Sequence, residues 1–295
     1  PPAREPAARV TLGGPPPRGP PALTHPTFSP LTIPPSEGIA DIRLNRPDKS
    51  NSMNDAMWHE IRSAFDWVDS MPEARVAILS GEGRNFCAGI DLSLLASLGQ
   101  QVANPDGARS REALRRLIID LQDCLTAAER CRKPVIAAIQ GACIGGAIDL
   151  VTACGMRFAA ADAIFPVREI DVGLVADVGP LQRLPLLIPE GIARELAYTG
   201  RNFDAAEAEK LGLVNRIFAS REALTAGVRQ LAQAIAAKSP LAMRGTKEVM
   251  NYSRDHSVAD GLNFVATWNA AMLLSADLKE SVTAQSEKRA PRFPD

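Results

Sequence analysis

Aromatic side chains are scarce in this sequence. They make up 5% of its 295 residues, although hydrophobic residues as a whole reach 46%. A core of this composition has to be built from aliphatic side chains, and the balance is typical of a globular protein rather than a disordered one. Long apolar runs are missing as well. The longest, over residues 135–150, is broken by Gln140 and several glycines, whereas a membrane span needs roughly 18 apolar residues. We therefore expect no membrane partner.

An excess of charge of one sign is also absent. The 33 basic and 34 acidic side chains leave a net charge of -1, which argues against a nucleic-acid partner because such binding needs a basic surface. Histidine is limited to three scattered residues, and the five cysteines include no CxxC pair. The spacing of a metal site is therefore lacking, and we expect no metal. Unpaired thiols favour a reducing compartment, with a bacterial cytoplasm as the default and a mitochondrial matrix as the alternative.

Three segments are expected along the chain. Residues 1–36 are rich in proline and lack apolar periodicity, so we interpret them as a disordered arm. Residues 37–200 alternate strands with helices, and residues 201–295 are mostly helical. Together they predict an α/β fold with a helical C-terminal region. The expected strands include 39–44, 75–80, 134–139, 156–160 and 163–165, and the expected helices include one starting near Asn54, 91–98, 109–130 and 147–153.

Two glycine-containing turns, each leading into an expected helix, carry the first candidate chemistry. One contains Gly145 and Gly146, followed by Asp149 in the first turn of the helix, and the other contains Gly89 and Ile90. Glycine lets backbone N–H groups approach a ligand closely, and the start of a helix is electropositive. Two such turns could together stabilise an oxyanion. Paired glycines also serve plain packing, so this signal is weak when taken alone.

Carboxylates in apolar surroundings are the second candidate for catalytic chemistry. Asp149 lies among Ile and Val residues, Glu169 follows an apolar strand, and Asp177 lies in a stretch without any other charge. A single carboxylate of this kind can be a helix cap or a salt-bridge partner. Asp177 fits that explanation least, because its charged form is costly in apolar surroundings. Acids with shifted pKa values are what proton transfer at carbon requires.

From about Ile39 to Phe293, the chain contains a series of short motifs that, in their order, resemble the enoyl-CoA hydratase/isomerase (crotonase) superfamily. The segments that carry the resemblance are Arg46-Pro47, Asn51 to Met53, Phe86 to Asp91, Lys133 to Gly141, Gly145-Gly146 and Gln182 to Leu184. The resemblance implies a spiral of ββα units over residues 37–200. It also implies a helical C-terminal region over residues 201–295 that builds trimers, which pair into a homo-hexamer.

Within that superfamily the sequence looks most like the delta(3,5)-delta(2,4)-dienoyl-CoA isomerases of fatty acid beta-oxidation. The similar segments are 143–150, 167–179 and 252–258. A hydratase of the superfamily usually has Glu in place of Asp149 and Gly in place of Asp177. The resemblance therefore implies that Glu169 and Asp177 are an acid/base pair, with Asp149 in a supporting role. Which of the pair acts at C2 and which at C6 stays open at this point.

The resemblance also assigns the backbone N–H groups of Ile90 and Gly146 to an oxyanion hole. An acyl-CoA would be the substrate, and no cofactor is implied, because coenzyme A is itself part of the substrate. The residues implied to bind the substrate are Arg46, Lys49, Ala88, Gly89, Gly145 and Lys288.

Two rival functions remain. One is another reaction of the superfamily, either 2-enoyl-CoA hydration or 3,2-enoyl isomerisation, in which Asp177 would be a structural acid. The other is a non-catalytic protein that binds acyl-CoA or serves in an assembly. Such a protein would be expected to have lost one or more of the three acids, yet all three are present.

Overall fold

A single twisted sheet forms the centre of the molecule in the computed structural model, which describes residues 31–32 and 35–295. The predicted proline-rich arm falls almost entirely outside these residues. Seven strands are present among the described residues, in the order β1-β3-β4-β5-β6-β7, with β2 also paired to β3. Their bounds are β1 Leu31–Thr32, β2 Pro35–Ser36, β3 Ile39–Leu44, β4 Val76–Gly81, β5 Val135–Ile139, β6 Met156–Ala160 and β7 Arg216–Phe218.

From β3 to β7 every neighbouring pair of strands is parallel, whereas β1 and β2 run antiparallel to β3. A parallel sheet is covered on both faces, so its strands are nearly continuous apolar runs. β5 is an example, since all five of its residues are buried. The predicted strands at 39–44, 75–80, 134–139 and 156–160 are confirmed within one residue.

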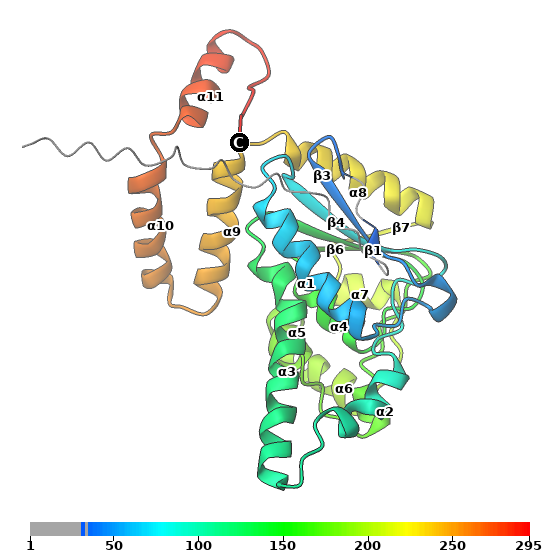
Figure 1. The fold of residues 1–295 in the computed structure, drawn as a ribbon. Helices are drawn as coiled ribbons and strands as arrows, with labels where there is room; N and C mark the ends of the chain where they lie inside the picture. Colours follow the sequence, from blue (N-terminus) through cyan, green and yellow to red (C-terminus); the bar gives the residue numbers. More distant parts are fainter. Residues whose placement is uncertain (1–30, 33–34) are drawn as a thin grey trace, which may run out of the picture.

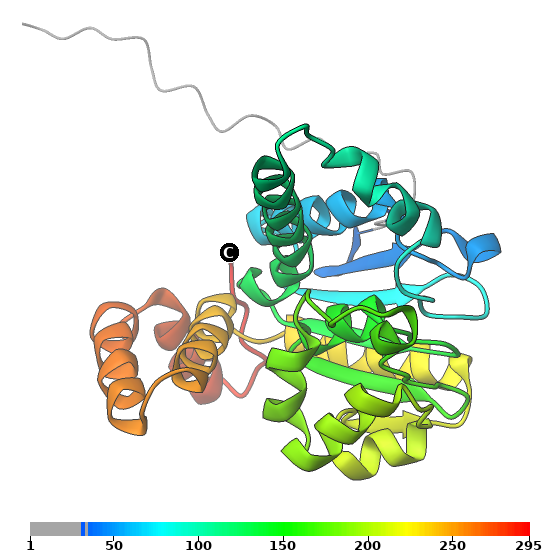
Figure 2. The ribbon, with the colours of Figure 1, turned by 90° about the horizontal axis from the view of Figure 1, so that it is seen from below.

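Helices cover both faces of this sheet (Figures 1 and 2). Alternate strand residues such as Ile78 and Ile136 pack against α8 (Arg221–Ala236) on one face. The intervening residues, such as Leu79 and Ile139, belong to the main core, which includes α1 (Asp55–Ser70) and α3 (Gly107–Arg130). The other helical segments of the core are η1 Pro47–Lys49, α2 Leu92–Gln101, α4 Gly146–Thr152, η2 Glu169–Val172, α5 Pro180–Leu187, α6 Glu190–Thr199 and α7 Ala205–Leu211.

Isolated β-bridges beyond the ends of the parallel strands supply the second β segment of each ββα unit. Single-residue parallel bridges join Met53 to Ile90, Cys87 to Cys143, and Ala142 to Ile164. Each turn of chain therefore runs from a sheet strand through a bridge segment into a helix, which confirms the predicted ββα spiral. The strand expected over 163–165 is reduced to the bridge residue Ile164.

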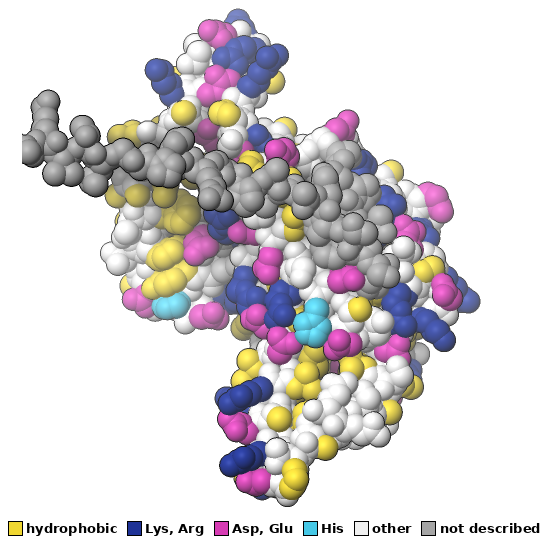
Figure 3. Space-filling model, viewed as in Figure 1, with side chains coloured by type: hydrophobic (Ala, Val, Ile, Leu, Met, Phe, Trp, Pro, Cys, Tyr) yellow, Lys and Arg dark blue, Asp and Glu magenta, His cyan; other side chains and the backbone are white. Residues whose placement is uncertain are grey.

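The last helices stand apart from the sheet (Figure 2). They are α9 Pro240–Arg254, α10 Val258–Met272 and α11 Ala276–Ser286, which confirms a helical C-terminal region. Hydrophobic side chains gather over α9 and α10 on the face shown in Figure 3. The sequence analysis did not predict β7. This strand extends the sheet past residue 200, and α8 packs on one face of the sheet. None of the helices in the described part of the chain has the length and apolar character needed to cross a membrane.

Candidate active site

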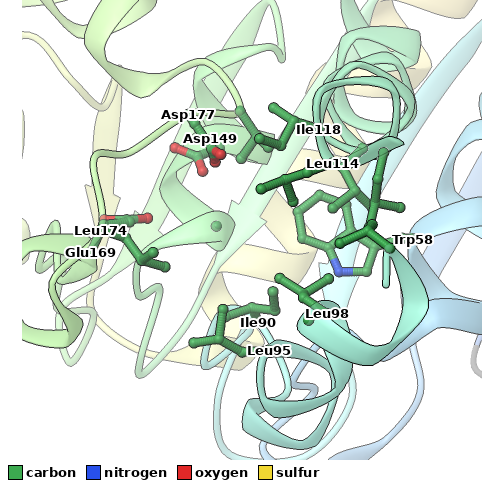
Figure 4. A pocket seen from close by; sticks show the side chains of 16 residues that line it. Trp58, Ile90, Leu95, Leu98, Leu114, Ile118, Asp149, Glu169, Leu174 and Asp177 are labelled. Atoms are coloured by element: carbon green, nitrogen blue, oxygen red, sulfur yellow. The ribbon is translucent and has the colours of Figure 1, made fainter. Parts of the chain in front are cut away.

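A cavity of about 300 Å³ lies between α2, α3 and the start of α4. Its walls include all three predicted acids, Asp149, Glu169 and Asp177, together with Ile90 and Gly146. In Figure 4 the three carboxylates lie on one side and Trp58 and the leucines of α2 and α3 on the other. The structure therefore gathers five predicted site residues, from four segments of the chain, around one space.

The backbone N–H of Ile90 has no partner among the described residues, for a geometric reason. In the bridge with Met53, the N–H of Met53 donates to the carbonyl of Gly89 at 2.7 Å, and the N–H of Asp91 donates to the carbonyl of Met53 at 3.0 Å. The bridge thus uses the residues on either side of Ile90. Gly146 is the first residue of α4, where the N–H has no acceptor inside the helix. Both N–H groups belong to residues that line the cavity.

Gly89 and Gly145 have backbone conformations that make this arrangement possible. Gly89 has φ of 87°, and a Cβ there would lie 2.7 Å from the carbonyl oxygen of Ile144. Gly145 has φ of 53°, and a Cβ there would lie 3.0 Å from Oε1 of Glu169. Positive φ is strained for other residues. Glycine therefore lets the two turns meet and brings the Glu169 carboxylate next to the turn that carries Gly146.

Asp149 is completely buried on α4, and neither of its carboxylate oxygens has a hydrogen-bond partner among the described residues. Burial raises its pKa well above the usual value, and the nearby negative charges of Glu169 and Asp177 raise the pKa further. The positive charge of Arg183 lowers the pKa, but its effect is the smallest of these contributions. A carboxyl group in this setting favours its neutral form.

Glu169 and Asp177 differ in exposure. Oε2 of Glu169 is buried and without a partner among the described residues. Burial raises the pKa of this group, a backbone hydrogen bond partly offsets the rise, and the charge of Asp177 adds a smaller increase. Asp177 is exposed on the loop after η2, and partial burial still raises its pKa. Its apolar neighbours predicted deeper burial, and Ala176 and Val178 are indeed buried, but the Asp177 side chain itself is exposed, and Val175 is 75% exposed.

Ala88 lies against the turn that contains Arg46, because the N–H of Ala88 donates to the carbonyl of Ser50 at 2.9 Å. Arg46 makes an ion pair with Asp91 at 3.1 Å, so it fixes this turn to the start of α2. Lys49 is exposed. Lys288 follows α11, which Figure 1 places at the opposite end of the molecule from α2. Within one chain, Lys288 is therefore not brought to the cavity, and its role stays a prediction.

The apolar wall is the part of the site that sequence analysis missed. Trp58, Leu95 and Leu98 line the cavity but were not singled out. Leu114 and Ile118 also line it, from the helix that was predicted over 109–130. A sequence signal for this wall is the apolar face of the helix over 109–130, which is wider than packing requires. In the structure, Leu114 on this face remains 36% exposed.

Within the described residues, one group could hold a metal ion by its geometry, namely His59, Asp120 and Cys124 between α1 and α3. Arg62 donates to Asp120 at 2.7 Å, and His59 hydrogen-bonds to the same carboxylate at 2.9 Å. The carboxylate charge is thus already balanced, and burial raises the pKa of the Cys124 thiol to about 11. These residues fit an ion-pair network better than a metal site.

Comparison with known proteins identifies the family. The enoyl-CoA hydratase/isomerase family matches residues 35–295. The solved structure of an enoyl-CoA hydratase from Bacillus anthracis superimposes with a TM-score of 0.81 at 30% identity, over 90% of this chain and 99% of that one. The chain belongs to the enoyl-CoA hydratase/isomerase family.

Two curated relatives are more similar in sequence. The peroxisomal delta(3,5)-delta(2,4)-dienoyl-CoA isomerase of Arabidopsis thaliana is 50% identical over 251 residues, which are 85% of this chain and 90% of the relative. The mitochondrial enzyme of that name from Homo sapiens is 46% identical over 252 residues, 85% of this chain and 77% of the relative. Their compartments are organelles, so they give no support to the cytoplasmic default.

Proposed function

We propose that this protein isomerises 3,5-dienoyl-CoA to 2,4-dienoyl-CoA in fatty acid beta-oxidation. The observation that carries the proposal is the presence of three carboxylates, Asp149, Glu169 and Asp177, in one cavity with the N–H groups of Ile90 and Gly146, which have no acceptor among the described residues. The two relatives named as dienoyl-CoA isomerases support it.

The proposed reaction moves one proton. A base removes a proton from C2, and the electron pair shifts along the diene, forming the C2–C3 and C4–C5 double bonds in place of C3–C4 and C5–C6. The developing negative charge rests mainly on the thioester oxygen, where the N–H groups of Ile90 and Gly146 stabilise it. An acid then delivers a proton to C6.

We assign Glu169 to C2 and Asp177 to C6. The thioester oxygen must lie at Gly146, and C2 is one carbon away from the thioester carbonyl. Glu169 lies beside this position, because its Oε1 is 3.0 Å from where a Cβ of Gly145 would be. Asp177 belongs to the more exposed rim. Raised pKa values suit both groups for proton transfer near neutral pH.

Asp149 has a supporting role in this proposal. Its pKa is raised well above the usual value and both of its oxygens lack partners among the described residues. In its neutral form it can donate a hydrogen bond to the dienolate. Such a donor, held in the dry part of the cavity, stabilises negative charge as it develops.

The acyl-CoA thioester would enter past the turn formed by Arg46, Lys49 and Ala88, with Gly89 and Gly145 shaping the backbone around its carbonyl. The apolar wall from α2 and α3 suits the acyl chain. The reaction transfers neither electrons nor a group to the enzyme, so it needs no cofactor besides the coenzyme A of the substrate. For the compartment we propose the mitochondrial matrix, which the name of the human relative supports.

The proposed assembly is a homo-hexamer formed by two trimers. Its support is the apolar surface of the C-terminal helices, where Val258 is 80% exposed, Leu262 63% and Leu274 93%. Side chains of this type are seldom left together in water. Light scattering should give six times the chain mass of 31.5 kDa, and a mass of one subunit would contradict the assembly.

Absorbance with two substrates tests the reaction. With 3,5-octadienoyl-CoA the protein should produce the spectrum of a diene conjugated to the thioester carbonyl, and with crotonyl-CoA it should consume little substrate. Rapid hydration of crotonyl-CoA without formation of the conjugated diene would instead identify a hydratase. Inactivity toward both, with binding retained, would support a non-catalytic acyl-CoA-binding protein.

A further inference from the structure

A second cavity, of about 370 Å³, adjoins the first at Asp177. Asp177 and Val178 line both cavities. The two cavities have opposite polarity. Apart from the acids, the first is lined mainly by apolar side chains, whereas the second is lined mainly by polar and charged side chains. These are Gln122, Thr126, Glu129, Gln182, Arg183, Arg254 and Asp255.

The walls of this polar cavity are held by an ion-pair network. Arg183 donates to Glu129 at 2.8 Å and to Thr126 at 3.1 Å, and the side chains of Arg183 and Glu129 are only 14% and 17% exposed. Arg254 of α9 pairs with the same glutamate. Gln122 donates to the backbone carbonyl of Asp177 at 2.6 Å, which fixes the Asp177 loop to the cavity wall.

A space of this size and polarity suits water. It is many times larger than the roughly 10–15 Å³ that one water molecule needs, and its polar side chains offer hydrogen bonds to water. The first cavity is apolar around the acyl chain, where water would be excluded once substrate is bound. Asp177 thus lies at the boundary between a dry cavity and a polar one.

We propose that the polar cavity is the route by which Asp177 exchanges its proton with solvent during turnover, so that the hydrogen delivered to C6 comes from water. This inference rests on the proposed isomerase function. In each turnover the C2–H bond breaks and its proton goes to Glu169, and a proton from Asp177 forms the new C6–H bond. The enzyme returns to its starting state when Asp177 takes a proton from water in the polar cavity and Glu169 releases one.

The competing route is an internal relay through Asp149, which would pass the C2 proton from Glu169 back to Asp177. Such a relay needs a chain of hydrogen bonds. Both oxygens of Asp149 and Oε2 of Glu169 lack partners among the described residues. Asp177 is exposed, by contrast, and needs no intermediate side chain to meet water.

Isotope labelling over many turnovers distinguishes the routes. Substrate carrying deuterium at both C2 positions is converted in ordinary water with a small amount of enzyme, and the product is analysed by NMR at C6. The proposal predicts protium at C6, and in heavy water unlabelled substrate should acquire deuterium there. Transfer of the C2 deuterium to C6 in ordinary water would overturn the proposal. If no 2,4-dienoyl product formed at all, the isomerase function itself would be refuted, and this route with it.

A variant that fills the polar cavity gives a second readout. Gln182 lines it from α5, and Gln182→Trp should lower kcat about tenfold with little effect on KM, since reprotonation of Asp177 becomes limiting. The matched control is Leu181→Trp at the preceding residue, which lines neither cavity and should keep the kcat of the wild type. If both variants had the wild-type kcat and isotope pattern, the polar cavity would be excluded as the route.

Discussion

Replacing Asp149 by leucine should stabilise the protein while it impairs turnover. Asp149 is completely buried, and neither oxygen has a hydrogen-bond partner among the described residues. An unsatisfied buried polar group costs about 1–3 kcal/mol, which an apolar side chain does not incur. Leucine has the same number of non-hydrogen atoms as aspartate, and the neighbouring cavity gives its bulkier methyl groups room. We expect a gain of about 1–3 kcal/mol in the free energy of unfolding and a rise in Tm of about 3–8 °C.

The pH dependence of this gain follows from the sign of the pKa shift. The pKa of Asp149 is higher in the folded than in the unfolded protein, so between the two values the folded state binds more protons. Wild-type stability therefore falls as pH rises through this window, by up to about 1.4 kcal/mol per pH unit. The leucine variant lacks this loss, so its advantage should be larger at pH 8 than at pH 5.

Thermal unfolding at both pH values measures this difference, with Asp177→Leu as the matched control. Asp177 is exposed, so its replacement should change stability by no more than about 0.5 kcal/mol. A lower Tm for Asp149→Leu, or a difference that does not change with pH, would refute the view that Asp149 is held unpaired at the expense of stability.

Three further outcomes are expected. Gly89→Ala should cost about 1–3 kcal/mol of stability, because φ is 87° there, and should lower kcat about 100-fold by moving the Ile90 N–H; a wild-type kcat would argue against this donor. Lys247→Met should cost about 3 kcal/mol in urea unfolding, because its ammonium group donates to three carbonyls around the end of α3; an unchanged midpoint would contradict this. The five buried thiols should react with a disulfide reagent only after unfolding, since burial raises the pKa of Cys87 and Cys154 to about 12; rapid labelling of the folded protein would contradict it.

Features governed by local physics were predictable from the sequence. Asn54 marks the start of α1 because its side chain accepts a hydrogen bond from the N–H of Met57, as an N-cap does. The turn with Gly145 and Gly146 was recognisable because positive φ and close approach require glycine. Asp149 then follows in the first turn of α4 by simple spacing.

Features that depend on distant parts of the chain were not predictable in this way. β7 is only Arg216–Phe218 and forms because it pairs with β6, so no periodic pattern announces it. The apolar residues around Asp177 suggested burial, and Ala176 and Val178 are buried, but the side chain of Asp177 between them is exposed. The N–H of Ile90 has no acceptor in the described part of the chain because of the register of its bridge with Met53, which only the folded chain defines.

The turnover of Asp177→Asn with 3,5-octadienoyl-CoA tests the central claim most directly. The amide matches the carboxyl in size but cannot deliver the proton to C6, and because Asp177 is exposed, the fold should be unaffected. We predict a fall in kcat of at least about 100-fold with wild-type Tm and little change in KM. Formation of the conjugated 2,4-dienoyl product at the wild-type rate would contradict the proposal that Asp177 is the acid of a three-carboxylate isomerase.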